Sequence, residues 1–347
     1  MSETILVTDG GDRGARSTLA AVRALAAAGY RAMVTIDRQL SLAACSRYCS
    51  EYVITPNADD PRFAESVRDA ARLHDAAGIL PASDAVLAVL GAPVQELINK
   101  TSLAKRAARV GFAVPATQRI ESEESLRAWA EEFPYPIVLK PEVSQSPAVR
   151  LSTPREVFEF RLNGPAVVQP YLEGPMEATA GMIRDGRLVA VVHQRYLRTW
   201  PMDCGTSCAA ITVEGDTARE EKLLELFAEY EGIFQVQFRD GHLLDVNPRV
   251  YGSLPLAVAA GANLAALQAD LLLGKPAPQR LLRGRHGVRY RWIDGDLRHA
   301  ASLVMSGRLR SALSAVLPHR GTVHSIWSWR DPVPSLLRAK LLLEKLR

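Results

Sequence analysis

The stretch from Phe234 to Arg249 constrains the fold of this chain more than any other segment. Two apolar runs flank Asp240-Gly241, a dipeptide typical of tight turns between antiparallel strands. If the loop has three residues, Asp240 to His242, side-chain alternation places four polar residues on one face of the hairpin: Gln235, Gln237, Asp245 and Asn247. A two-residue loop would put Gln237 and Asp245 on opposite faces, so this register is an assumption.

Polar oxygens gathered on one face of a half-buried sheet are costly without a binding partner. Mg²⁺ bound to nucleotide phosphates is such a partner, because it prefers one or two carboxylates together with other oxygens and water. In this hypothesis Asp245 is the main ligand, Asn247 is a neutral second ligand, and Arg249 is a fork for phosphate or carboxylate. The alternative is a surface hairpin whose polar residues face water, since short motifs have appreciable false-positive rates.

Residues 1–98 alternate strand and helix patterns, which predicts a Rossmann-like parallel sheet with helices covering both faces. The loop after the first strand, Asp9 to Gly14, resembles the fingerprint G-x-G-x-x-G, but Asp9 replaces the first glycine and would repel a pyrophosphate. We therefore expect no NAD site. Loops at the carboxyl ends of parallel strands still form ligand crevices. Four residues are substrate-side candidates, with a purely structural turn as the alternative: Asp9, Arg16, Ser83 and Asp84.

The rest of the chain divides into a small α+β unit over residues 112–172 and a larger sheet with strands at 178–184, 187–193 and 232–247. The small unit contains a buried strand that ends in Lys140, so the stem of this lysine is expected to be packed. Residues 286–347 form a mixed tail that is not assigned as an independent domain. Helices are predicted at residues 17–28, 61–77, 99–112, 122–132, 154–162, 216–230 and 254–273.

Composition indicates an ordinary globular protein, with 48% hydrophobic and 23% charged residues. No apolar run reaches the roughly 18 residues of a membrane span. The first residues lack a basic segment and read as a strand, not a signal peptide, so we expect a cytoplasmic protein. Its four cysteines are then reduced thiols, with metal ligation as the alternative: Cys45, Cys49, Cys204 and Cys208.

Charge is unevenly distributed. Residues 280–347 carry 14 basic and 4 acidic side chains, a net +10, which leaves −6 for residues 1–279. A basic end can steer acidic substrates, nucleic acid or anionic lipid, and it can equally be a solvated face. Nucleic-acid binding is not expected, because Trp327 and Trp329 alone make no stacking platform.

Leu244–Arg249, followed by Tyr251–Ala257, resembles the metal-binding strand of ATP-grasp ligases, most of all the carboxylate–amine ligases similar to carbamoyl phosphate synthase. Other segments resemble motifs of this family in the same order, and ordered matches are far more specific than one motif. The resemblance covers about residues 1–275. These segments are Asn99-Lys100 with Pro115–Thr117 (opening helix and strand), Tyr135–Pro141 (phosphate-lysine strand), Val167–Gly174 (adenine-binding hinge), and His193–Arg195 with Gly205 and Ser207 (triphosphate and substrate loop).

The resemblance implies a two-lobed ATP-grasp fold after the Rossmann-like domain. The implied domains are residues 1–98, the small lobe or lid with its opening helix at 99–190, the large lobe with the metal site at 191–285, and a basic extension at 286–347. The implied ligands are ATP and Mg²⁺. The resemblance implies that Lys100 and Lys140 contact the phosphates, that Gln169, Tyr171 and Leu172 form the adenine hinge, and that Glu173 or Glu177 binds the ribose hydroxyls. It implies that Arg195 and Arg249 bind the γ-phosphate or the substrate carboxylate. The implied metal ligands are Asp245, Asn247 and Gln237.

The implied activity joins a small-molecule carboxylate to an amine through an acyl phosphate, with release of ADP. The protein mainly positions the reactants and neutralises charge on the transferring group. The small unit would act as a lid that excludes water. A homodimer is compatible with this activity, and neither a nucleic acid nor a membrane span is part of it.

Three departures from the family pattern favour a second hypothesis, a catalytically weakened nucleotide-binding protein that acts through a partner. Gln237 stands where the family usually has a metal-binding Glu, so metal affinity should fall. Asp245 stands where Glu is common and has a shorter reach. The loop from Glu142 to Ala148 has no glycine, although close approach of backbone amides to phosphates favours glycine.

The C-terminal segment Ser335–Arg347 combines leucines with basic residues, a pattern of a basic amphipathic helix. Docking onto the body of the protein is the expected arrangement, because terminal helices are often tied down. Peripheral membrane contact is the alternative.

Overall fold

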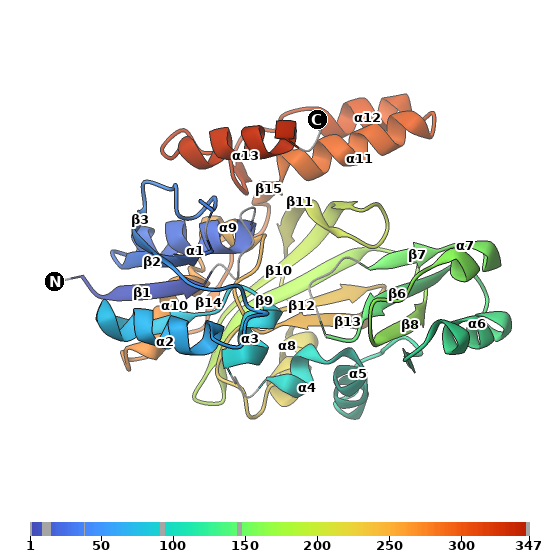
Figure 1. Ribbon diagram of the computed structural model, residues 1–347, viewed down its shortest axis with the longest axis horizontal. Coiled ribbons are helices and arrows are strands. Elements are labelled where there is room, and N and C mark those ends of the chain that lie inside the picture. The colour runs from blue at the N-terminus through green and yellow to red at the C-terminus, as the bar shows by residue number, and fades with distance from the viewer. Residues whose placement is uncertain (1, 9–14, 38, 91–93, 144–147, 345–347) are drawn as a thin grey trace.

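The computed structural model describes residues 2–8, 15–37, 39–90, 94–143 and 148–344. A large sheet lies at the centre, with a parallel N-terminal sheet on one side and a small antiparallel sheet on the other (Figure 1). The predicted combination of α/β and α+β architecture is therefore confirmed.

The N-terminal part forms a four-stranded parallel sheet with helices on both faces. Its elements are β1 (Thr4–Thr8), α1 (Arg16–Ala27), β2 (Arg31–Ile36), β3 (Cys49–Ile54), α2 (Phe63–Leu73) and β4 (Ala76–Leu80). The strand order is β3-β2-β1-β4. Ile5 and Val7 pack in one core with α1, whereas Leu6 packs in another with α2, because successive side chains of a strand face opposite ways. Gly29 follows α1 at φ +86°, a conformation that glycine adopts without strain.

Three short helices lead out of this sheet: α3 (Asp84–Leu90), α4 (Gln95–Ile98) and α5 (Lys100–Arg109). The Asn99 side chain accepts a hydrogen bond from the backbone N–H of Ser102 and so caps α5. This cap makes Lys100 the first residue of its helix.

The small sheet is antiparallel, with strand order β5-β8-β6-β7, and has its own apolar core. Its elements are β5 (Gln118–Ile120), α6 (Glu123–Glu132), β6 (Ile137–Pro141), β7 (Val149–Leu151), α7 (Pro154–Glu159) and β8 (Ala166–Pro170). Ser122 caps α6 through reciprocal hydrogen bonds with Ser125. A core of its own allows this lobe to behave as one unit.

The large sheet joins strands from most of the second half of the chain. Its elements are β9 (Met176–Arg184), β10 (Arg187–Trp200), β11 (Thr206–Val213), α8 (Thr217–Leu226), β12 (Gly232–Arg239), β13 (His242–Asn247), β14 (Leu282–Arg283), β15 (Arg289–Arg291) and β16 (Thr322–His324). The order is β13-β12-β9-β10-β11-β15-β16, and β14 pairs with β10. The predicted boundary between residues 190 and 191 falls inside β10, and the predicted extension supplies β15 and β16.

One predicted helix, 254–273, is two helices, α9 (Leu254–Ala260) and α10 (Leu264–Leu272). Gly261 separates them at φ +104°, and Asn263 caps the second helix. Both pack in the core that also contains α1. Within the described residues, no single helix has the length and apolar character needed to cross a membrane, although α9 and α10, bent by 94° to each other, pass such a test as a pair.

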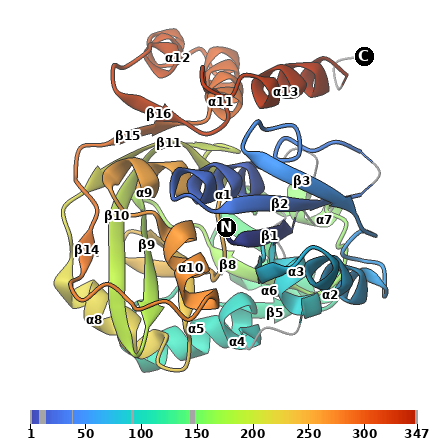
Figure 2. The same cartoon turned by 90° about the vertical axis from the view of Figure 1, so that its left-hand side faces the viewer.

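The C-terminal helices lie along one side of the molecule, above the N-terminal sheet and the large sheet (Figures 1 and 2). They are α11 (Ile293–Met305), α12 (Leu309–Val316) and α13 (Val333–Glu344). Leu337 of α13 packs against the main core, whereas Leu336 is 66% exposed.

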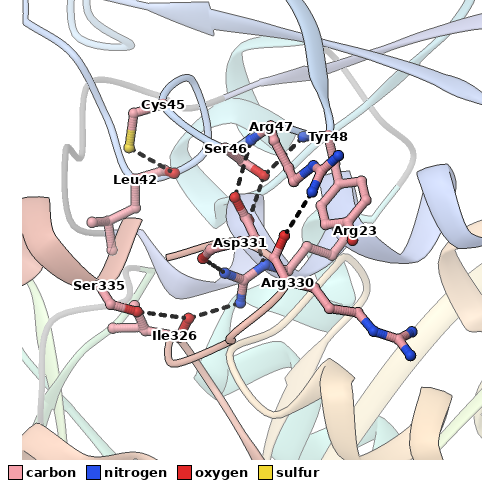
Figure 3. Close-up of polar contacts among 10 residues, drawn as sticks. All are labelled: Arg23, Leu42, Cys45, Ser46, Arg47, Tyr48, Ile326, Arg330, Asp331 and Ser335. Atoms are coloured by element: carbon pink, nitrogen blue, oxygen red, sulfur yellow. Dashed lines mark hydrogen bonds and ion pairs between the residues drawn. The ribbon is translucent and has the colours of Figure 1, made fainter. Parts of the chain in front are cut away.

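Asp331 fastens this segment to the N-terminal domain (Figure 3). Its carboxylate is fully buried and accepts hydrogen bonds from Arg23 Nε at 2.9 Å, Ser46 Oγ at 2.7 Å and the backbone N–H of Arg47 at 3.0 Å. A buried carboxylate is stable only when it is paired in this way. The segment before α13 is therefore docked on the body of the protein.

Candidate active site

A cavity of about 430 Å³ opens where the three sheets approach one another. Most of the predicted site residues line it: Lys100, Lys140, Gln169, Tyr171, Leu172, Gln237, Asp245, Asn247 and Arg249. The substrate-side candidates Arg16, Ser83 and Asp84 line it as well, although they come from the N-terminal domain. Segments far apart in sequence thus contribute to one site.

The hairpin has the predicted pairing but not the predicted loop. Asp240 and Gly241, at φ 47° and 76°, form a two-residue turn, so Arg239 pairs with His242. A register shift next to Gln237 then brings this residue opposite Asp245, with Gln235 opposite Asn247. The prediction of a three-residue loop was wrong. A bulge instead supplies the extra residue that keeps the polar side chains on one face.

Asp245 faces two lysines. Lys100 Nζ lies 3.8 Å from Asp245 Oδ1, and the Lys100 side chain is only 7% exposed. Burial, helped by the charge of Lys100 and opposed by the charge of Asp245, lowers the pKa of Lys140 to about 8. Two cations around one carboxylate leave this part of the cavity positive, as binding of a polyanion requires.

Arg249 is already held by protein groups. Its Nε donates to Asp84 Oδ1 at 2.6 Å, its Nη2 donates to Asn247 Oδ1 at 2.6 Å, and its Nη1 donates to the carbonyl of Val250 at 3.0 Å. Arg249, Asp84 and Asn247 are all buried. The Asp84 carboxylate offsets the charge of Arg249, so this geometry favours orientation of Asn247 over capture of a substrate anion.

The predicted metal ligands comprise one carboxylate and two amides. The described residues contain no group of three or more His, Cys, Asp or Glu side chains that could hold a metal ion. An amide oxygen has two lone pairs, so Asn247 can accept from Arg249 and still bind a cation. This donor set fits one Mg²⁺ that shares phosphate oxygens and water, and it does not fit a second metal held by protein carboxylates.

The predicted adenine hinge follows β8. The backbone N–H of Tyr171 donates to the carbonyl of Pro136 at 3.0 Å, so it is already used. The guanidinium groups of Arg150 and Arg239 lie 4.3 and 4.8 Å from the centre of the Tyr171 ring. Gln169 is buried, and its amide donates to Thr117 Oγ1 at 2.9 Å. Gln169 therefore joins two segments of the small lobe.

Three predicted residues do not line the cavity: Arg195, Glu173 and Glu177. Tyr196 does, and alternation along β10 directs its neighbour Arg195 to the other face of the sheet. There Arg195 Nε lies 3.7 Å from Glu177 Oε1, and Arg219 donates to Glu177 Oε2 at 3.0 Å. Glu173 is exposed. The roles predicted for these residues have no support in the geometry of the cavity.

Several lining residues were not predicted, among them Trp292, which lies beyond residues 1–275, the part of the sequence on which the resemblance was based. The guanidinium of Arg16 stands 3.8 Å over the Trp292 ring, and its Nη1 donates to Tyr290 Oη at 2.9 Å. Alternation of basic and aromatic residues from Arg289 to Trp292 was the available signal, because it is typical of a strand with one packed face. Asp9 and residues 144–147 of the glycine-free loop lie outside the described residues.

Residues 163–296 match a family model described as "ATP-grasp in the biosynthetic pathway with Ter operon". The carbamoyl phosphate synthase large chains of Neisseria meningitidis serogroups B and A are 24% and 23% identical to this chain. Each alignment covers 48% of this chain and only 18% of the relative. The chain thus corresponds to a small part of those enzymes.

Solved structures show the same fold at low sequence identity. N5-carboxyaminoimidazole synthetase from Staphylococcus aureus, complexed with ADP, has a TM-score of 0.63 at 12% identity and covers 83% of this chain and 82% of its own. The biotin carboxylase domain of Hydrogenobacter thermophilus 2-oxoglutarate carboxylase, with MgADP and bicarbonate, has a TM-score of 0.62 at 14% identity, covering 83% and 73%. L-amino acid ligase from Bacillus licheniformis has 0.58 at 15%, covering 80% and 75%.

The family match, the curated relatives and the solved structures agree with the ordered motifs of the sequence. Residues 163–296 thus match an ATP-grasp family model, and part of the chain is similar to the large chain of carbamoyl phosphate synthase.

Proposed function

We propose that this protein is an ATP- and Mg²⁺-dependent ligase that joins a carboxylate to an amine and releases ADP and phosphate. The observation that carries the proposal is the position of Lys100 and Lys140 around Asp245, in a cavity between the two lobes. Similar proteins have been solved with ADP or MgADP. The cytoplasmic location and the homodimer stay predictions.

In this proposal the triphosphate lies against Lys100 and Lys140, and the adenine lies near Leu172 of the hinge. Asp245 would hold Mg²⁺, with Gln237 and Asn247 as neutral ligands. When bound, Mg²⁺ neutralises negative charge on the transferring phosphoryl group. Arg249 acts on Asn247, whose amide oxygen it orients.

The chemistry has two steps. A carboxylate oxygen of the first substrate attacks the γ-phosphorus of ATP, the bond to the β–γ bridging oxygen breaks, and ADP leaves. The amine then attacks the acyl carbon, loses a proton, and displaces inorganic phosphate. The chain positions both substrates, and its small lobe shields the acyl phosphate from water, which would otherwise hydrolyse it.

A second candidate function is nucleotide binding without turnover. The single carboxylate among the metal ligands favours this function, because a site with fewer charged ligands has a lower affinity for Mg²⁺. Calorimetry separates the two candidates: ATP binding that is indifferent to Mg²⁺, with no ADP formed, would support the second.

The test of the ligase is release of ADP and phosphate from ATP, in the presence of Mg²⁺, on addition of pooled carboxylic acids and amines. Active pools are then divided until one acid and one amine remain, and the product is identified by mass spectrometry. Lys140→Met should abolish turnover. Arg155→Gln, which removes a charge from a side chain that is 85% exposed on the small lobe, is the matched control. The proposal fails if no pool stimulates ADP release.

A further inference from the structure

The cavity has a second polar region, around Arg16, whose residues come from segments other than the metal hairpin. Arg16 begins α1 in the N-terminal domain, and Trp292 directly precedes α11 near the C-terminal helices. Thr206 and Ser207 of β11 and Gly252 also line this part of the wall. We call Arg16, Ser207, Tyr251, Tyr290 and Trp292 the Arg16 cluster.

Arg16 differs from Arg249, another arginine that lines the cavity. Arg249 is paired with the carboxylate of Asp84. Within the described part of the chain, no ion pair joins Arg16 to a carboxylate, and its partners are Tyr290 Oη at 2.9 Å and Thr206 Oγ1 at 3.4 Å. A guanidinium carries five N–H donors. Arg16 therefore keeps both its charge and hydrogen-bonding capacity for a ligand.

The cluster also contains buried polar atoms without partners among the described residues: Ser207 Oγ, Tyr251 Oη and Trp292 Nε1. Their side chains are at most 9% exposed and all line the cavity. Buried polar atoms are nearly always hydrogen-bonded, so each of these exceptions calls for a partner. The indole N–H can only donate, so its partner must be an acceptor such as an oxygen atom.

The position of Arg16 is set closely by its surroundings. Its guanidinium stacks on Trp292 at 3.8 Å. Across from it, a Cβ atom added to Gly252 would lie 3.1 Å from Arg16 Cζ, so any side chain there would press on the guanidinium. Tyr290 Oη accepts from Arg16 and donates to the carbonyl of Gly252 at 3.0 Å. Such a fixed cation suits recognition of a planar anion.

We infer that the Arg16 cluster is the binding site for the acid substrate, and that this substrate is a small organic acid whose carboxylate binds Arg16 and which carries a second oxygen acceptor for the cluster. The inference rests on the proposed function, because that function requires the protein to bind an acid substrate. It assigns Arg16, in place of Arg249, as the cation that holds the substrate, because Asp84 already offsets the charge of Arg249.

The test uses the full chain with ADP and Mg²⁺ and measures binding, not turnover. The probes are L-malate, succinate and N-acetyl-L-aspartate, which have a second oxygen acceptor, against butyrate, which has none. We expect at least one probe of the first group to raise the melting temperature and to bind in calorimetry, with butyrate inert. Arg16→Gln should weaken this binding roughly tenfold to hundredfold, the range of a charge-assisted hydrogen bond.

Two further variants distinguish binding from folding. Trp292→Phe keeps a ring beneath Arg16 but removes the N–H, and it should weaken the bound acid while ADP binding is unchanged. Arg155→Gln should bind acid and ADP as the native chain does. If no probe of the first group binds, or if binding survives in Arg16→Gln, the inference is wrong. If acids bind at Arg16 but no ADP is ever released, the inference stands and the ligase proposal fails.

Discussion

On the hairpin side of the cavity the polar side chains bind one another, whereas in the Arg16 cluster several of them have no partner within the described residues. Arg249, Asp84 and Asn247 form a closed set of buried hydrogen bonds. Arg16 meets two hydroxyl groups and an aromatic ring. In the first region, hydrogen bonds within the protein fix the positions of the side chains. In the second region, polar atoms are available to form hydrogen bonds with a ligand.

The largest expected effect is a loss of stability when the hydrogen-bonded set of Arg249, Asp84 and Asn247 is broken. Asp84→Ala leaves the Arg249 guanidinium buried without its carboxylate, which costs about 3–5 kcal/mol when a buried pair loses one member. Denaturant unfolding of the two variants Asp84→Ala and Arg16→Gln measures the difference, and the second should cost much less because it removes no ion pair of the described residues. Glu159→Ala, from an exposed pair on α7, is the control and should change stability little. Equal losses for Asp84→Ala and Arg16→Gln would contradict the contrast drawn between the two regions.

The next effect concerns turnover. Asp245→Asn keeps the shape of the side chain but removes the one carboxylate of the metal-ligand set, so we expect ADP release to fall about 10²–10³-fold, as when a group that stabilises developing charge is lost. The Asp245 side chain is 28% exposed, which argues against a large loss of stability. Steady-state kinetics at several Mg²⁺ concentrations measure this. Full activity in Asp245→Asn would remove the hairpin from the proposed mechanism.

The sequence allowed prediction of most of the hairpin side of the cavity. Its signals were local: alternation along β12 and β13, the Asp240-Gly241 turn, and Lys140 at the end of an apolar strand. Even the error in loop length did no harm, because the bulge beside Gln237 restored the pairing. Energetic pressure to keep polar groups on one face determines the register more strongly than the turn does.

The Arg16 cluster could not be assembled from the sequence, because its members are brought together only by tertiary packing. Arg16 was one of several loop candidates, and nothing in its neighbourhood points to Trp292. Pairing of β15 with β11 and the docking of Asp331 on Arg23 place the C-terminal segment against the N-terminal domain. Arg195 is the opposite case: its motif is local, but the alternation of side chains along β10 directs it away from the cavity.

A smaller effect is expected when a charge is added to the hairpin side of the cavity. Gln237→Glu places a second carboxylate opposite Asp245, so affinity for Mg²⁺ should rise about tenfold, in line with the dependence of such sites on ligand charge. Calorimetric titration of Mg²⁺ in the presence of ADP measures the change. Gln235→Glu is a poor comparison because Gln235 donates to Ser253 Oγ in the interior. Glu159→Gln, at an exposed side chain on α7, is the better control. Unchanged affinity in Gln237→Glu would mean that this position does not bind the metal.

The smallest expected effect is a dependence of ATP binding on pH. Burial lowers the pKa of Lys140 to about 8, so in the free protein this lysine is charged below pH 8 and neutral above it. A bound triphosphate favours the charged form, so above pH 8 binding must take up a proton, and affinity should fall toward pH 9 by up to about tenfold. In Lys140→Arg the group keeps its charge throughout this range, and the fall should be much smaller. Calorimetry in buffers of different ionisation enthalpy counts the protons taken up, and parallel profiles for the two proteins would show that Lys140 does not meet the phosphates.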